Sequence, residues 1–197
     1  MSERTSTRTV AADLVPADVG LILPPLPPGG HREPDLVELA RRLNVDESAW
    51  VALAPYLAFD ARQYRRVRVF RDEHWEGLLL CWLPGQATAV HDHGGSIGLS
   101  FVLSGALTEE RWTPVAEGKP LALLGACQVT RGDAAVELLD TIHRVSNRSA
   151  EPAVSLHFYS PPLTTLGAHD LALGTRWAVP VADSDDVQVG GDPGLIS

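Results

Sequence analysis

Residues 91–105 read His91-Asp-His-Gly-Gly-Ser-Ile-Gly-Leu-Ser-Phe-Val-Leu-Ser-Gly105, and this stretch is the strongest indication of the fold in the sequence. Side chains two positions apart on a β-strand point to the same face, about 6.6 Å apart along the chain, so His91 and His93 can bind one metal ion. A third histidine, His143, lies in the segment 142–147. It predicts a later strand that completes the site.

The expected ligand set contains three imidazoles and no matching carboxylate. Imidazole suits iron, copper, zinc and nickel, and the usual triad of non-haem iron oxygenases is two histidines and one carboxylate. Here the motif contains no carboxylate, which indicates a metal site that differs from the usual triad.

Strand patterns surround the histidines from Arg66 onward. The spacing of apolar residues changes there to a period of two, and turn residues such as Pro84-Gly85 and Ser104-Gly105 separate the segments. The expected strands cover 66–72, 77–83, 97–103, 106–113, 121–124, 127–130, 134–139 and 153–159. Short strands without intervening helices predict an antiparallel barrel or a double-sheet jelly roll, and they exclude a parallel α/β sheet.

Two helices are expected before the strands. Pro34 and Asp35 suit a helix start. A second helix is expected to have Trp50, Leu53, Ala54 and Leu57 on its apolar face and to end at Phe59-Asp60. Residues 1–33 contain Pro-Pro-Leu-Pro-Pro-Gly-Gly, which favours an extended N-terminal arm. We expect one domain over 34–175 and a flexible C-terminal tail over 176–197, poorly ordered from about Ala182.

Composition narrows the possible partners. The chain has 197 residues, 45% of them hydrophobic, which suffices for one domain and its core. Its net charge of −9 argues against binding to nucleic acid or to an anionic membrane surface. The start lacks the hydrophobic region of a signal peptide, and no apolar run approaches eighteen residues. We expect a cytoplasmic monomer with a small-molecule partner.

The other candidate ligands favour structural roles. Cys81 and Cys127 lie in or beside apolar or β-like runs without a neighbouring histidine or cysteine, so we expect both to be buried and inert. His31, His74 and His169 lie in loop-like contexts and are expected to face solvent.

The spacing around the histidines resembles the two cupin motifs. Gly85, the His-x-His pair and Gly105 match the first motif, and Gly132, His143 and Asn147 match the second. The resemblance implies a mainly β cupin fold, a double-stranded β-helix or jelly-roll barrel with N-terminal α-helices. The glutamate of the first motif would fall at Ile97 or Gly98 and is absent.

Two longer runs resemble the cysteine dioxygenase family of thiol dioxygenases. They are His91-Asp-His-Gly-Gly-Ser-Ile-Gly98, and His143-Arg-Val-Ser-Asn147 through Glu151-Pro-Ala-Val-Ser-Leu-His-Phe-Tyr-Ser-Pro-Pro162. The resemblance covers about residues 35–170, and it implies Fe²⁺ at His91, His93 and His143. Three neutral imidazoles leave the charge of Fe²⁺ uncompensated, which favours an incoming thiolate as the anionic ligand. The sulfur would then be oxidised to the sulfinic level.

The family holds the substrate carboxylate with an arginine in a Tyr-x-Arg pattern, which Tyr64-Arg65-Arg66 matches. Strand alternation places Tyr64 and Arg66 on one face, and a guanidinium offers the bidentate fork that a carboxylate prefers. A slip of one residue would put Arg65 in that place instead. A solvated basic edge strand is the structural alternative.

Ser155, His157 and Tyr159 alternate on one face of a later strand and match the family's catalytic relay. In that interpretation His157 orients Tyr159 through a hydrogen bond, and the phenol steers bound O₂ or the substrate sulfur. A hydrogen-bonded core network is the alternative. Relatives carry a cis Ser-Pro bond after this strand, here at Ser160-Pro161.

Gly98 departs from the animal members of the family, which carry a cysteine there that is cross-linked to the tyrosine at the Tyr159 position. Many bacterial relatives share the glycine, and Arg66 distinguishes the chain from mercaptopropionate dioxygenases, which use Gln at that place. The resemblance therefore implies a bacterial, arginine-type enzyme that converts L-cysteine and O₂ to cysteine sulfinic acid. A dioxygenase for another small thiol, such as 3-mercaptopropionate, and a non-catalytic metal-binding cupin remain the alternatives.

Overall fold

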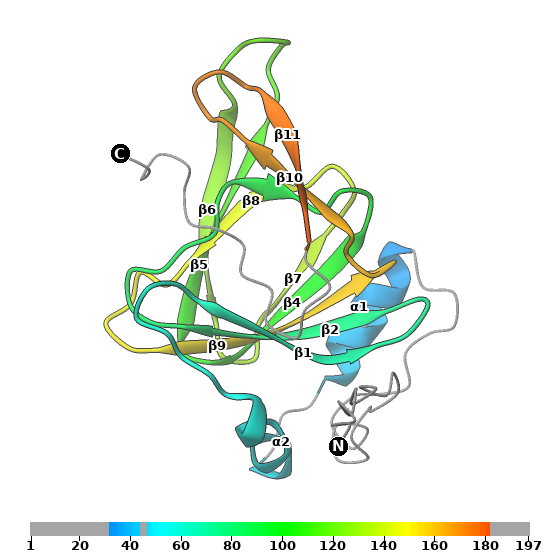
Figure 1. Cartoon of the computed structure of the whole chain (residues 1–197), viewed down its shortest axis with the longest axis vertical. Helices are drawn as coiled ribbons and strands as arrows, with labels where there is room; N and C mark the ends of the chain where they lie inside the picture. Colours follow the sequence, from blue (N-terminus) through cyan, green and yellow to red (C-terminus); the bar gives the residue numbers. More distant parts are fainter. Residues whose placement is uncertain (1–31, 44–46, 182–197) are drawn as a thin grey trace, which may run out of the picture.

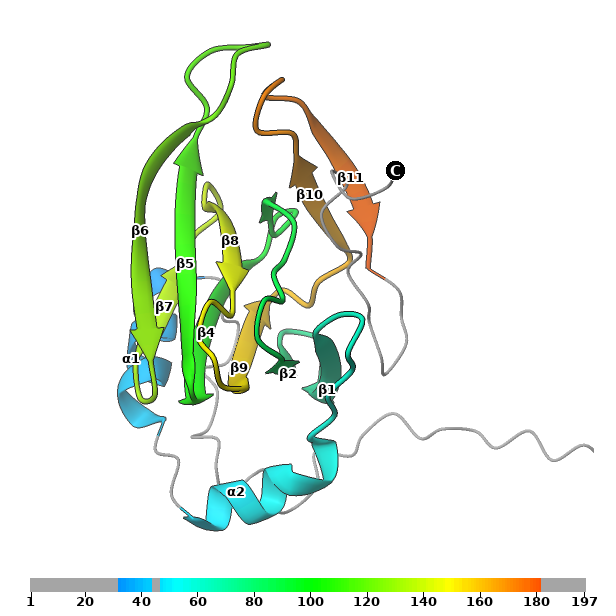
Figure 2. The same ribbon diagram turned by 90° about the vertical axis from the view of Figure 1, so that its left-hand side faces the viewer.

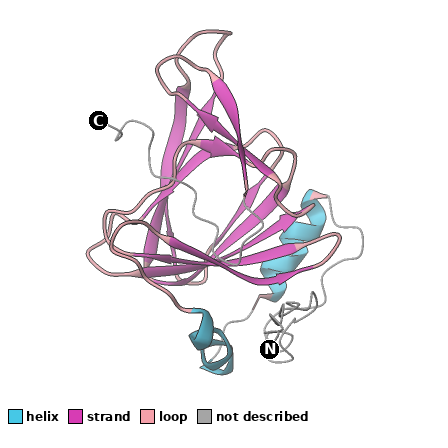
Figure 3. Cartoon of the chain, viewed as in Figure 1, coloured by secondary structure: helices cyan, strands magenta, loops and turns pink. Residues whose placement is uncertain are grey.

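The computed structural model describes residues 32–43 and 47–181, and their strands form two sheets. The five-stranded sheet has the order β1-β2-β9-β4-β7, and the six-stranded sheet has the order β11-β10-β3-β8-β5-β6. All neighbouring strands pair antiparallel. Figure 3 shows strands making up most of the molecule, with the helices at its periphery. The mainly β prediction and the N-terminal helices are confirmed.

The elements follow the chain in one series. Within the described residues, two α-helices and a short 3₁₀ helix precede the strands: α1 (Glu33–Arg42), α2 (Glu47–Leu53) and η2 (Ala54–Tyr56). The strands are β1 (Arg65–Arg71), β2 (Glu76–Trp82), β3 (His91–Asp92), β4 (Ile97–Ser104), β5 (Ala106–Thr113), β6 (Ala122–Thr130), β7 (Ala134–Glu137), β8 (Ile142–Ser146), β9 (Ala153–Ser160), β10 (Thr165–His169) and β11 (Arg176–Pro180).

Strand β2 shows how the five-stranded sheet is buried on both faces. Its residues are all buried, and they alternate between two hydrophobic clusters. Leu79 belongs to the same hydrophobic cluster as Leu36 and Leu39 of α1, whereas Leu80 belongs to a second cluster with residues of the six-stranded sheet such as Val145. Figures 1 and 2 both show α1 beside β4 and β7. The helix therefore covers the outer face of this sheet, and the inner face is directed toward the other sheet.

The helices follow the sequence signals only in part. Helix α1 begins at Glu33 with Pro34 in its first turn, as its sequence predicts. The second helix is shorter than expected, because Pro55 lacks a backbone N–H and the chain continues as a 3₁₀ turn. Within the described residues, no helix is long and apolar enough to cross a membrane.

The C-terminal boundary differs from the expected one. Residues 176–180, placed in a flexible tail from sequence, form β11 and pair along β10 from Arg176↔His169 to Pro180↔Thr165. The residues of β11 are mostly exposed, so the strand carries little apolar alternation to mark it. The expected N-terminal arm before residue 32 and the stretch from 182 lie outside the described residues.

Three smaller features of the structure relate to the sequence predictions. The segments expected at 121–124 and 127–130 form one strand, β6. Cys81 is buried as expected, whereas Cys127 on β6 is exposed because that strand lies at the sheet edge. The Ser160–Pro161 peptide bond is cis.

Candidate metal centre

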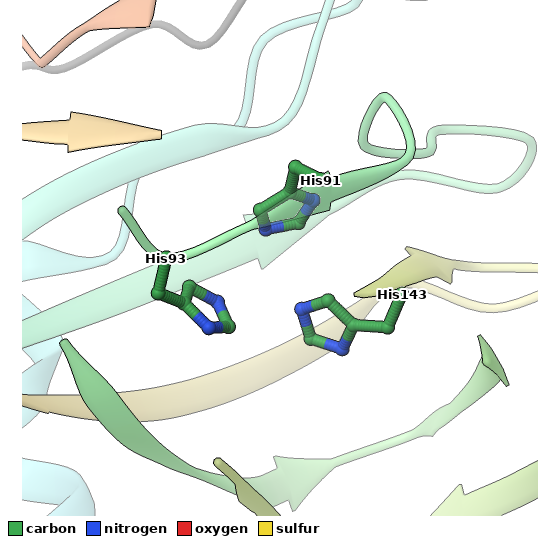
Figure 4. A group of neighbouring side chains, drawn as sticks. All are labelled: His91, His93 and His143. Carbon is green, nitrogen blue, oxygen red and sulfur yellow. The ribbon is translucent and has the colours of Figure 1, made fainter. Parts of the chain in front are cut away.

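Three histidines converge between the two sheets. His91 lies on β3, His93 directly follows that strand, and His143 lies on β8 in register with His91. Their candidate ligand nitrogens all lie within 4.8 Å of one another, and all three side chains are buried. Figure 4 shows the three rings turned toward a common point. The structure therefore brings together the histidines that the sequence motif singled out.

Hydrogen bonds fix how two of the rings are presented. The Nδ1–H of His91 donates to the backbone carbonyl of Ala89 at 3.0 Å, and that of His143 donates to the Glu109 carboxylate at 2.9 Å. Arg111 holds Glu109 in turn, with its Nε 3.0 Å from Oε1. A histidine whose Nδ1 is held in this way presents Nε2 to a metal, and a carboxylate behind the ring strengthens it as a ligand.

Three ring nitrogens of the site have no hydrogen-bond partner in the described part of the protein. Nε2 of His143 and both ring nitrogens of His93 are buried without a hydrogen bond. Burial lowers the pKa of His91 to about 3 and that of His93 well below its usual value, so both rings are neutral. Neutral imidazoles with orphaned nitrogens aimed at one point fit a divalent cation.

Arg66 and Tyr64 line a small cavity together with His91 and His143. Arg66 is 4% exposed, and its Nη1 has no hydrogen-bond partner. Arg65 points away, with a side chain 23% exposed and a nitrogen 3.8 Å from Asp60. The register is thus the one in which Arg66 faces the histidines.

A chain of hydrogen bonds joins the other side of the cavity. The indole N–H of Trp82 donates to Ser155 Oγ at 2.9 Å, Ser155 Oγ lies 2.8 Å from His157 Nε2, and His157 Nδ1 lies 3.2 Å from the Tyr159 hydroxyl. The hydrogen bond expected between His157 and Tyr159 is therefore present. The Tyr159 ring lies 5.0 Å from the His93 ring, measured between centroids, which places the phenol beside the metal centre.

The indole of Trp82 sets the direction of that chain. An indole nitrogen can only donate, so Ser155 Oγ accepts from Trp82, and the hydrogen of Ser155 is itself paired when it is donated to Nε2 of His157. Burial lowers the pKa of His157 to about 3, and the single hydrogen of the neutral ring then lies on Nδ1 and is donated to Tyr159. The hydroxyl hydrogen of Tyr159 is left for a group in the cavity. Burial raises the pKa of Tyr159 well above its usual value, which keeps that hydrogen in place.

Several residues of the site escaped the sequence reasoning. Trp82, Glu109 and Glu137 have no motif of their own, although the alternation of Glu109 and Arg111 on one strand is a weak signal for a buried ion pair. His169 was expected to face solvent and does not: its side chain is 6% exposed and its Nε2 lies 2.8 Å from Asp92. The expectation was wrong because His169 lies on β10, which pairs with β3.

Two antiparallel sheets that enclose three buried histidines define a metal-binding cupin. The model of the family described as cysteine dioxygenase type I matches residues 33–172. The chain belongs to that family. Its relatives include cysteine dioxygenase type 1 of Homo sapiens, 34% identical over 150 residues, which make up 73% of this chain and 74% of the relative.

Two further similar proteins are a second curated relative and a solved structure. Cysteine dioxygenase type 1 of Bos taurus is 32% identical over the same shares of the two chains. Among solved structures, the TT1209 protein of Thermus thermophilus is 30% identical, with a TM-score of 0.44 over 55% of this chain and 93% of its own.

Proposed function

We propose that this protein is a non-haem iron dioxygenase that converts L-cysteine and O₂ into cysteine sulfinic acid. Family membership and the three buried histidines support the reaction class. One observation carries the choice of substrate: a buried guanidinium, Arg66, faces the cavity with an unpaired nitrogen. A buried guanidinium nitrogen without a hydrogen-bond partner is costly, so the cavity favours a ligand that brings a carboxylate.

Fe²⁺ bound by His91, His93 and His143 would supply the Lewis-acidic, redox-active centre at which a thiolate and O₂ react. The protein's part is to bind and orient. Arg66 holds the substrate carboxylate through its fork of N–H donors, which fixes the distance from the carboxylate to the sulfur. Leu80, Val145 and other apolar side chains that line the cavity keep water away.

Tyr159 acts as a hydrogen-bond donor in this proposal. Trp82, Ser155 and His157 direct the hydroxyl hydrogen of Tyr159 toward the cavity, as derived from their hydrogen bonds. A donor that is already oriented stabilises negative charge on oxygen or sulfur without first having to reorganise. His157 and Ser155 are positioning residues, since they act through the phenol.

We further propose that the protein is a cytoplasmic monomer whose partners are the small thiol and O₂. Cys81 and Cys127 are both free thiols, which suits a reducing compartment. Size-exclusion chromatography with light scattering tests the oligomeric state, and a dimer of stable mass would contradict it.

Anaerobic reconstitution with Fe²⁺, followed by oxygen uptake with a panel of thiols, tests the function. We expect about one iron per chain and turnover that ranks L-cysteine above both cysteamine, which lacks the carboxylate, and 3-mercaptopropionate, which lacks the amine. His143→Ala should lose most of the iron, because a site of three neutral ligands keeps only two. Equal iron content and turnover in that variant would overturn the metal site, whereas a faster rate with 3-mercaptopropionate would reassign the substrate. Iron without any turnover would indicate a non-catalytic cupin.

A further inference from the structure

Glu137 is a buried carboxylate that lies beside His93 and Ser100 but makes no well-formed hydrogen bond. It ends β7 with its side chain 0% exposed, and neither carboxylate oxygen makes a hydrogen bond. Its Oε2 lies 3.3 Å from Nε2 of His93, which also lacks a hydrogen bond. A buried polar group without a partner destabilises a fold, so two such atoms facing each other require an explanation.

The strand register explains how Glu137 reaches this place. Strand β7 pairs with β4 so that Glu137 lies opposite Gly98. A Cβ atom at Gly98 would lie 2.6 Å from the Glu137 Oε2, closer than real contacts allow. Because glycine has no side chain, the Glu137 carboxylate can occupy the space beside position 98. In the first cupin motif the glutamate would fall at Ile97 or Gly98, so β7 supplies from the neighbouring strand the acid that β4 lacks.

The distance between the two unpaired atoms fits a shared cation. Nitrogen and oxygen ligands that bind a first-row metal at about 2.1 Å are about 3.0 Å apart at a right angle and about 3.4 Å apart at a tetrahedral angle. The 3.3 Å between Glu137 Oε2 and His93 Nε2 lies in that range. A cation next to His93 would satisfy both atoms at once.

We infer that Glu137 is a fourth, anionic ligand of the metal centre in the substrate-free protein. The inference rests on the proposed metal site at His91, His93 and His143, and not on the identity of the thiol. It sets this chain apart from a centre of three neutral imidazoles, because one negative charge is supplied by the protein before the substrate arrives. Such a centre holds its metal more tightly at rest.

Anaerobic titration with Co²⁺, without thiol, tests the inference. Glu137→Gln keeps the shape and removes the charge, and it should weaken Co²⁺ binding at least about tenfold and change the visible absorption of the bound ion. Glu110→Gln is the matched control. Glu110 is also buried on a strand, but it pairs with Arg144 and Arg148 outside the cavity. Its substitution should leave Co²⁺ affinity and spectrum unchanged.

The stability of the metal-free protein separates a ligand from a structural residue. Glu137→Met, which removes the unpaired polar atoms at similar length, should raise the melting temperature without metal while it weakens Co²⁺ binding. A higher melting temperature together with weaker Co²⁺ binding supports the inference. A Glu137→Gln protein with wild-type Co²⁺ affinity and spectrum overturns it, as does a Glu137→Met protein that is less stable and binds Co²⁺ normally. If the wild type binds no Co²⁺, or His143→Ala binds it equally well, the three-histidine site itself fails.

Discussion

At the residue scale, charges that lack a partner in the cavity determine what the site can bind. Arg66 presents a cation and the histidines present neutral nitrogens, so a ligand with a thiolate at one end and a carboxylate at the other matches both. The apolar lining leaves water little access to either group. Selectivity should therefore depend on Arg66 more than on shape alone.

Replacing Arg66 by alanine should remove most of the selectivity for a carboxylate. Loss of a buried, charge-assisted, bidentate contact costs several kcal/mol, so kcat/KM for L-cysteine should fall by about a hundredfold or more, while cysteamine is affected far less. Arg65→Ala is the control, because that side chain is partly exposed near Asp60. Oxygen uptake with both thiols measures the effect. An equal loss for cysteine and cysteamine would show that the carboxylate binds elsewhere.

Gly98 and Tyr159 allow a second residue-scale prediction. They are directly paired across β4 and β9, and a Cβ at Gly98 would lie 2.8 Å from Cε1 of Tyr159. The wild type should keep an unmodified Tyr159 after turnover, since it has no sulfur at this place. A Gly98→Cys variant should form the thioether with Tyr159 during turnover with iron, O₂ and cysteine, detected as loss of two hydrogens by intact mass and by a joined peptide.

A second variant, which also changes Glu137, tests the same prediction. Its carboxylate occupies space that a side chain at Gly98 needs, so Gly98→Cys with Glu137→Ala, supplied with excess Fe²⁺ because the inferred fourth ligand is missing, should cross-link more completely than Gly98→Cys alone. If the double variant turns over cysteine and never cross-links, Tyr159 does not lie beside the reacting centre. Its role as a hydrogen-bond donor would then have to be abandoned.

Residues of the site differ in how far sequence can reveal them. The three histidines follow from motif spacing, whereas Arg66 and Tyr159 follow from the resemblance to the cysteine dioxygenase family. Glu137 does not, because its place beside His93 depends on the pairing of β7 with β4, and Glu109 likewise depends on the pairing of β5 with β8. Pairing between strands is a long-range property that no local pattern contains.

At the element scale, the shortest strand carries one of the three ligands and leads directly into a second. Strand β3 has only two residues, so its own backbone pairing is slight. Asp92 supplements it: its carboxylate accepts hydrogen bonds from Gly94 N at 2.8 Å and from Arg176 Nε at 2.6 Å, and it lies 2.8 Å from His169 Nε2. These contacts join the loop after β3 to β10 and β11.

Asp92→Ala should therefore loosen the edge of the six-stranded sheet. We expect a loss of about 2 kcal/mol in the free energy of unfolding, because three polar partners lose one partly buried carboxylate. Glu38→Ala, which removes an exposed pair with Arg42 on α1, is the control and should cost under about 0.5 kcal/mol. Urea denaturation measures both. Equal stability of the two variants would mean that β3 is held by its backbone alone.

Elements were predictable where periodicity was strong. Strands β1, β2, β4, β5 and β9 lie within about a residue of their expected ranges, because their side chains alternate or are continuously apolar. Strands β10 and β11 were not expected. The first was assigned to a loop together with His169, and the second is an exposed edge strand held by pairing with β10 and by the Arg176–Asp92 ion pair.

At the scale of the whole molecule, we propose that residues 34–181 form the single domain. The expected boundary at 175 moves outward by one strand, since β11 pairs along the full length of β10. Both sheets supply the cavity, with Arg66 and Tyr159 from one and His91 and His143 from the other. The site therefore exists only when the sheets are packed together. The protonation states of its residues consequently affect the free energy of unfolding of the whole domain.

Those protonation states predict a dependence of stability on pH. Burial lowers the pKa of His91 and His157 to about 3, and that of His93 well below its usual value, whereas unfolded imidazoles titrate near 6.5. Below about pH 6.5 the unfolded chain binds protons that the folded chain does not, so the metal-free protein loses stability as pH falls. Glu137 acts in the opposite direction, because burial raises its pKa and the folded chain then holds a proton that the unfolded chain releases.

Each buried imidazole should contribute at most about one proton, or about 1.4 kcal/mol per pH unit, to the fall in the free energy of unfolding of the metal-free protein below pH 6.5. Urea unfolding of the metal-free protein at pH 7.5, 6.5 and 5.5 measures it. His157→Gln should lower the slope by about one proton, because the unfolded variant has one imidazole fewer to protonate. A stability that stays constant from pH 7.5 to 5.5 would mean that the buried imidazoles accept protons in the folded state, and the neutral ligand set would have to be given up.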